Sequence, residues 1–209
     1  MAKTQSKTLG LGAGALLAGA TLSAAVIWLM IALPVLEGAK AAAHDKHYLS
    51  VIVHAAGGTA MLFVGATALY IGLSRNAFRF HKIAGYLYLS GGGLGAGSGL
   101  VLSILNPHPL PGASVATGLL AATWIAVAAM ALRAARNKRF DSHRQWMIRS
   151  CVLTWTFVFC RIVMTSPFGK TFDPPMIVAT IWATWITPLL LCELALQWRA
   201  GSRDREIVR

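Results

Sequence analysis

The segment SVATGLLAATWIAVAAMALRAARNKRFDSHRQWMIRSCVLTWTFVFCRIVMT, residues 114–165, decides the fold of this chain. It contains two apolar stretches, residues 114–135 and 145–165, each long enough for a helix to cross a hydrocarbon core of about 30 Å. Basic residues crowd into the segment between them and its immediate borders: Arg133, Arg136, Lys138, Arg139 and Arg144. Because Lys and Arg concentrate in cytoplasmic loops, this pattern predicts a helical hairpin whose turn lies on the cytoplasmic side.

The same alternation of apolar stretches and polar gaps covers the rest of the chain. Six apolar stretches are present, at residues 11–36, 49–73, 83–105, 114–135, 145–165 and 175–198. Lipid offers no hydrogen bonds to the backbone, so stretches of this length cross a membrane as helices. We therefore predict an all-α, polytopic integral membrane protein with six transmembrane helices, in a single transmembrane domain over residues 1–209.

The composition agrees with a membrane protein and argues against nucleic-acid binding. Hydrophobic residues make up 56% of the chain and charged residues only 12%, whereas soluble domains carry roughly 25% charged residues. The net charge of +12 comes from residues beside apolar stretches, not from one solvated basic face. Anionic lipid headgroups on the cytoplasmic side are the expected partners.

The distribution of charge over the gaps also predicts the orientation. Arg75, Arg79 and Lys82 fill the gap before the third apolar stretch, whereas residues 106–112 carry no charge. This places both termini in the cytoplasm, and in a bacterial host the protein would be a multi-pass protein of the inner membrane. A cleaved signal peptide is the alternative for residues 11–36, although this stretch exceeds the usual apolar region of 7–15 residues.

The glycine-rich segment in residues 91–99 resembles a nucleotide-binding loop only superficially. A dinucleotide fingerprint requires a preceding strand, and here the glycines lie within an apolar stretch. Gly91, Gly95 and Gly99 recur every four residues, a spacing that allows another helix to approach the backbone closely. We expect helix packing here rather than a cofactor site.

Four histidines form two candidate pairs, one on each side of the membrane. His81 and His143 open the third and fifth apolar stretches on the inner side, and His54 and His108 lie toward the outer side. Paired imidazoles from different helices are typical ligands of haem b. Arg79, Lys82, Arg139 and Arg144 are available for the propionates on the inner side, and Arg161 is the deep cation on the outer side.

Three charged residues lie at least one helical turn inside the apolar stretches, where an isolated charge is costly. They are Arg149, Arg161 and Glu193. We predict that Arg149 and Glu193 form a structural ion pair, because both lie one to two turns from the inner side. Arg161 has no acidic residue at its own depth, which leaves room for an anionic ligand group.

The residues around these histidines resemble those of a bacterial family of predicted membrane proteins, domain of unknown function 2306. The resemblance rests on His54, on the segment RFHKIAGY at residues 79–86, on HRQWMIRS at residues 143–150 and on Arg161. A looser likeness is to cytochrome b561-type bundles, which carry one haem ligand on each of four consecutive helices. It implies a four-helix core from the second to the fifth helix, with His81 paired with His143 and His54 with His108.

Two hypotheses about function follow from these observations. The first is a transmembrane electron-transfer protein that binds haem b through His81 and His143 and exchanges electrons with a quinol or a redox protein. The second is a non-enzymatic membrane factor that assists assembly of another complex or binds a small ligand without haem. A transporter ranks third, because no inverted repeat is evident. No hydrolase or transferase motif is present in the sequence.

Overall fold

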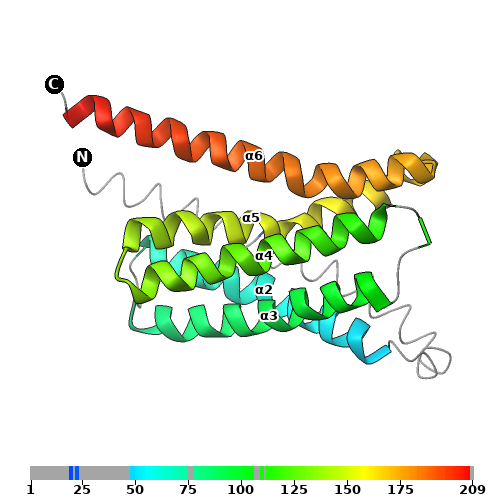
Figure 1. Cartoon of the computed structure of the whole chain (residues 1–209), viewed down its shortest axis with the longest axis horizontal. Coiled ribbons are helices and arrows are strands. Elements are labelled where there is room, and N and C mark those ends of the chain that lie inside the picture. Colours follow the sequence, from blue (N-terminus) through cyan, green and yellow to red (C-terminus); the bar gives the residue numbers. More distant parts are fainter. Residues whose placement is uncertain are drawn as a thin grey trace.

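The computed structural model describes residues 19–20, 22–23, 48–74, 78–105, 109–110 and 112–207. Within them, the regular secondary structure is helical and five helices are long and apolar enough to cross a membrane, in agreement with a polytopic membrane protein. The first predicted helix, residues 11–36, lies almost entirely outside the described residues, so a sixth span stays a prediction. The five helices are α2 (Tyr48–Ser74), α3 (His81–Leu105), α4 (Ala113–Arg136), α5 (Phe140–Thr165) and α6 (Pro174–Ile207) (Figure 1).

Helices α2 to α5 form a ring in which each helix packs on the next. The most extensive contact is between α2 and α3, followed by α4 with α5 and α3 with α4, and a smaller contact between α2 and α5 closes the ring. Helices α3 and α5 therefore lie diagonally opposite each other. Helix α6 packs on α5 and α4 and diverges from the bundle toward its C-terminal end (Figure 1).

The centre of the bundle is filled by large side chains that fit against glycines. Tyr88 and Trp124 are buried and lie 5.8 Å apart between ring centroids. Gly65 of α2 makes room for the Tyr88 ring, since an added Cβ would lie 2.6 Å from its Cε2. Gly92 of α3 makes room for Trp124 in the same way. These contacts form a close-packed layer in the middle of the bundle. The layer lies about two helical turns further along α3 than His81.

The glycines spaced four residues apart pack α3 against α2, as the sequence predicts. A Cβ added to Gly95 would lie 3.1 Å from the backbone nitrogen of Gly58, and one added to Gly91 would lie 3.4 Å from the Cβ of Ala60. A Cβ added to Gly99 would approach the His54 ring to 2.9 Å. All three glycines therefore face α2, and the two backbones approach as closely as small residues permit.

The outer surface of the bundle is apolar, as expected for helices in contact with lipid. Exposed side chains include Ile83, Leu87 and Leu94 on α3, Val115 and Leu119 on α4, Ile162 on α5, and Leu190, Leu191 and Leu194 on α6. Such extensive exposed apolar surface is rare on a soluble monomer. The surface therefore agrees with the five candidate spans.

Helix α5 begins at Phe140, five residues earlier than the apolar pattern predicts, because the connection from α4 is a tight turn. The N–H of Arg139 donates to the carbonyl of Ala134 at 2.9 Å, and that of Lys138 donates to Ala135 at 3.0 Å. These are the two bonds of a Schellman motif, with Lys138 in the left-handed position at φ 57°. The polar residues that follow continue as helix because its hydrogen bonds are internal.

Helix α6 also extends beyond its predicted end, from residue 198 to Ile207. The hydropathy pattern predicts only the part of a helix that lipid covers. A helix whose next residues are charged can continue beyond the membrane into the aqueous phase. The last turns of α6 contain such residues, including Arg203, Asp204 and Glu206.

Candidate functional site

The structure brings His81 and His143 together at one end of the bundle. His81 is the first residue of α3, and His143 lies in the first turn of α5. Their ring centroids are 6.3 Å apart and the ring planes are nearly perpendicular, at 84°. Since α3 and α5 are diagonal in the ring of helices, the two imidazoles meet across the bundle axis rather than along one helix surface.

Each of these histidines is held against the helix beside its own. The Nδ1–H of His143 donates to the carbonyl oxygen of Ala131 on α4, with a nitrogen–oxygen distance of 2.9 Å. His81 has a hydrogen bond to the backbone of Ala68 on α2, and its Cε1 would lie 3.0 Å from a Cβ at Gly72. Both rings are half-buried. Backbone carbonyls of this kind orient an imidazole and fix its tautomer.

A buried hydroxyl network lies two helical turns deeper on the same helices. Tyr88 follows His81 by seven residues and Ser150 follows His143 by seven. The Tyr88 hydroxyl is 2.7 Å from the Ser150 Oγ and 2.9 Å from the Thr154 Oγ1. The Nε1–H of Trp124 donates to the same Thr154 oxygen at 3.1 Å. Sequence reasoning missed this network; the only signal for it is the seven-residue spacing, which places Tyr88 and Ser150 on the same helix faces as the two histidines.

The network has one self-consistent arrangement of protons. The hydroxyl of Thr154 donates its single proton to the Ser150 carbonyl at 2.9 Å, so its oxygen accepts from both Trp124 and Tyr88. The Tyr88 proton is thereby committed to Thr154, and the Ser150 hydroxyl donates to Tyr88. Every polar atom in this group has a partner, so the network joins α3, α4 and α5 without an unpaired buried group.

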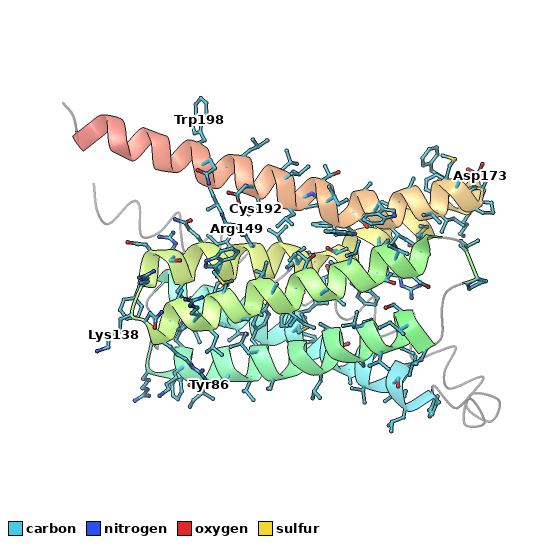
Figure 2. All side chains as sticks on the ribbon, in the orientation of Figure 1. Tyr86, Lys138, Arg149, Asp173, Cys192 and Trp198 are labelled. Atoms are coloured by element: carbon cyan, nitrogen blue, oxygen red, sulfur yellow. The ribbon has the colours of Figure 1, made fainter. Side chains whose placement is uncertain are left out.

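Arg149 and Glu193 form an ion pair between α5 and α6. The Nε and Nη2 of Arg149 donate to the Glu193 Oε2 at 2.8 and 2.6 Å, and the Gln197 amide donates to Oε1 at 2.8 Å. The guanidinium carbon lies 4.8 Å from the centroid of the Trp146 ring. Figure 2 shows Arg149 directed from α5 toward α6. The two charges, costly when separate, are thus satisfied together.

We expect Arg149→Gln and Glu193→Gln each to lower the apparent free energy of unfolding by about 1–2 kcal/mol, because each leaves one charge unpaired. The side chain of Glu193 is 40% exposed, which moderates the loss.

The double variant should cost less than the sum of the two single variants, with a coupling of about 1 kcal/mol. SDS-induced unfolding in mixed micelles measures all three. Arg136→Gln, an exposed cation of α4, is the control. Additive effects would show that the pair contributes nothing as a pair.

A family model described as predicted membrane protein (DUF2306) matches residues 51–196. The chain belongs to this family. Comparison with curated proteins and with solved structures finds no match. The matched range of the DUF2306 chain contains His81, His143 and both partners of the ion pair. The family description establishes a membrane protein and leaves its activity to be argued from the site.

On the opposite side of this DUF2306 chain, the structure does not bring a second histidine pair together within the described residues. His108 lies outside them, and His54 is exposed on α2, where its Nδ1–H donates to the Gly95 carbonyl at 2.7 Å. Arg161 is also exposed, with its guanidinium carbon 5.6 Å from the Phe157 ring centroid. His54 thus serves the contact between α2 and α3.

The candidate cations for a ligand are solvent-accessible at the end of the DUF2306 chain that carries the histidine pair. Arg144 is exposed one residue after His143. The other exposed basic residues at that end are Arg79, Lys82, Arg133, Arg136, Lys138 and Arg139. They lie on or beside the two connections at this end, between α2 and α3 and between α4 and α5.

Within the described part of the DUF2306 chain, no three His, Cys, Asp or Glu side chains gather as ligands of a metal ion. Cys151, Cys160 and Cys192 are free thiols, each partly buried in a helix. A bare structural metal ion takes about four protein ligands. Among the described residues, His81 and His143 by themselves supply two such ligands.

Proposed function

We propose that this protein is a membrane electron-transfer protein that binds haem b through His81 and His143. The observation that supports this most is the separation of their ring centroids, 6.3 Å. With metal–nitrogen bonds of about 2.0–2.1 Å, two imidazoles on opposite sides of one metal hold their ring centroids roughly 6 Å apart. Rotation about the axis through the metal is free, so nearly perpendicular ring planes are compatible with this arrangement.

The hydrogen bond of His143 favours the same role. Donation from Nδ1–H to Ala131 leaves the lone pair on Nε2 for a metal, which is the usual arrangement of a ligating histidine. Haem supplies four nitrogen ligands of its own and a one-electron couple, and needs two axial ligands from the protein. The pair provides that number.

The surroundings of the pair fit a flat group between α3 and α5. Three residues that lie against the two rings on the flanking helices are small: Ala68 and Gly72 on α2, and Ala131 on α4. None has a side chain beyond Cβ, so the macrocycle would meet little bulk on either edge. Arg79, Lys82, Arg139 and Arg144, all exposed at this end, would neutralise the propionates.

The charge pattern supports an orientation with this end in the cytoplasm. The exposed basic residues gather here, and the positive-inside rule assigns such an end to the inner side of a bacterial plasma membrane. The C-terminus would then be cytoplasmic, and the N-terminus would be as well with residues 11–36 as a sixth span. A membrane quinol or a redox protein is the class of partner that fits a one-electron carrier at this depth.

The test is the absorption spectrum of detergent-purified protein from haem-replete cells, oxidised and reduced. We expect a sharp low-spin Soret band in wild type, lost in His81→Ala and in His143→Ala. His54→Ala is the matched control and should keep the full band, since His54 bonds α3 instead. His143→Met should retain haem with a raised reduction potential, because a thioether is also an axial ligand.

A folded, colourless wild-type protein would refute the proposal. Together with a stable copurifying protein, that result would favour the alternative of a non-enzymatic assembly factor. Equal loss of colour in His54→Ala and His81→Ala would instead contradict the assignment of the ligands.

A further inference from the structure

A hollow of about 230 Å³ lies beside the turn between α4 and α5, apart from the histidine pair. Its polar lining includes Arg133, Asn137, Arg139 and Ser142, and its apolar lining includes Met130 and Trp146. Figure 2 marks this turn with Lys138. Within the described residues, no carboxylate lines the hollow. The hollow therefore carries the positive charge of two arginines, and no acidic side chain in its lining neutralises that charge.

The turn fixes the backbone on which both arginines stand. The N–H of Asn137 donates to the carbonyl of Arg133 at 3.0 Å, and the N–H of Arg139 donates to that of Ala134 at 2.9 Å. The two arginines, with five residues between them in the sequence, thus stand on backbone that the turn holds in place. Two guanidinium groups, with an amide and a hydroxyl beside them, are well suited to the oxygens of a phosphate.

The lining of the hollow is polar near the turn and apolar further along the helices. A phospholipid has the same order of groups, with a polar headgroup followed by apolar acyl chains. Met130 lies three residues before Arg133, and Trp146 lies seven residues after Arg139, so both lie deeper in the membrane than the arginines. Tryptophan favours the boundary between headgroups and acyl chains. A free phosphate ion would use only the polar half of this lining, whereas a lipid uses both halves.

We propose that this hollow binds the phosphate of an anionic membrane lipid, with Arg133 and Arg139 on the phosphate and Met130 and Trp146 against the start of the acyl chains. The hollow shares Arg139 with the cations proposed for the haem propionates, but neither His81 nor His143 lines it, so lipid binding would persist in a colourless protein. A bound lipid would contact both α4 and α5 at the turn and so stabilise this hairpin.

The test is a titration of detergent-purified full-length protein with dioctanoyl phosphatidylglycerol. Binding is measured through the melting temperature of the protein and through its tryptophan fluorescence. We expect a saturable rise in melting temperature in wild type, and an affinity at least tenfold weaker in the Arg133→Gln/Arg139→Gln double variant. Arg139→Lys keeps the charge but loses the planar fork, so it should bind with intermediate affinity. Arg136→Gln removes a neighbouring exposed cation outside the hollow and should bind as wild type does.

Two further ligands separate the sources of the phosphate. Dioctanoyl phosphatidylcholine and inorganic phosphate should each shift the melting temperature far less than phosphatidylglycerol does. An equal shift with inorganic phosphate, or with phosphatidylcholine, would overturn the assignment to an anionic lipid. Loss of affinity in Arg136→Gln as large as in the double variant would show that general surface charge, not this hollow, attracts the lipid.

Discussion

Replacing Gly57 with alanine is expected to lower the free energy of unfolding by about 3 kcal/mol, at the upper end of the usual cost of overpacking. A Cβ at this position would lie 2.7 Å from the Gly91 carbonyl oxygen and from the Gly95 backbone nitrogen. Both neighbours are backbone atoms of α3, so no side chain can rotate away to relieve the contact. The two helices would have to separate along their closest approach.

The adjacent glycine provides the matched control. Nothing lies within 4 Å of a Cβ added to Gly58, so Gly58→Ala should be neutral or stabilising by up to about 1 kcal/mol through its better helix propensity. SDS titration in mixed micelles and the melting temperature of the purified protein measure both variants. Equal stability of Gly57→Ala and Gly58→Ala would show that the close approach of α2 and α3 is not as the structure has it.

Replacing Gly92 with alanine is expected to cost a similar amount, about 3 kcal/mol or more, for a different reason. The added Cβ would overlap the six-membered ring of Trp124, which is 4% exposed and has no free space to enter. Movement of the indole would also disturb its hydrogen bond to Thr154. The effect should therefore appear both in stability and in the tryptophan emission of the folded protein.

Gly93→Ala is the control for this prediction, because nothing lies within 4 Å of its added Cβ. A second substitution identifies the cause of the loss. In a Trp124→Phe background the smaller ring leaves space, so Gly92→Ala should cost clearly less than it does in wild type. Additive costs in the double variant would indicate that Gly92 acts through something other than Trp124.

The candidate site was partly predictable from the sequence. Charge in alternate gaps predicted that His81 and His143 lie on the same side of the membrane, and depth alone suggested that Arg149 pairs with Glu193. The structure adds that the two histidines meet at 6.3 Å across the bundle. It also changes the interpretation of His54, whose hydrogen bond to Gly95 serves the contact of α2 with α3. A lone polar residue in an apolar helix has a partner, but the sequence does not say which backbone supplies it.

The hydrogen bonds of the Tyr88 network could not be predicted from the sequence, because its members come from three helices. Tyr88, Trp124 and Thr154 are ordinary residues of apolar segments when viewed one at a time. Their hydrogen bonds depend on the rotation of each helix about its axis, and that rotation is fixed by where Gly65 and Gly92 leave space for rings.

What the sequence by itself determined is the class of the protein: long apolar stretches, basic gaps and glycines every four residues dictate membrane-spanning helices and a close contact of α3. These features are local, since each follows from the preference of a segment for lipid, water or a neighbouring backbone. Only the tertiary structure decided which side chains meet. The histidine pair, the hydroxyl network and the hollow at the α4–α5 turn all depend on diagonal or neighbouring helices whose order and rotation are set by packing, and packing is a property of all the helices together.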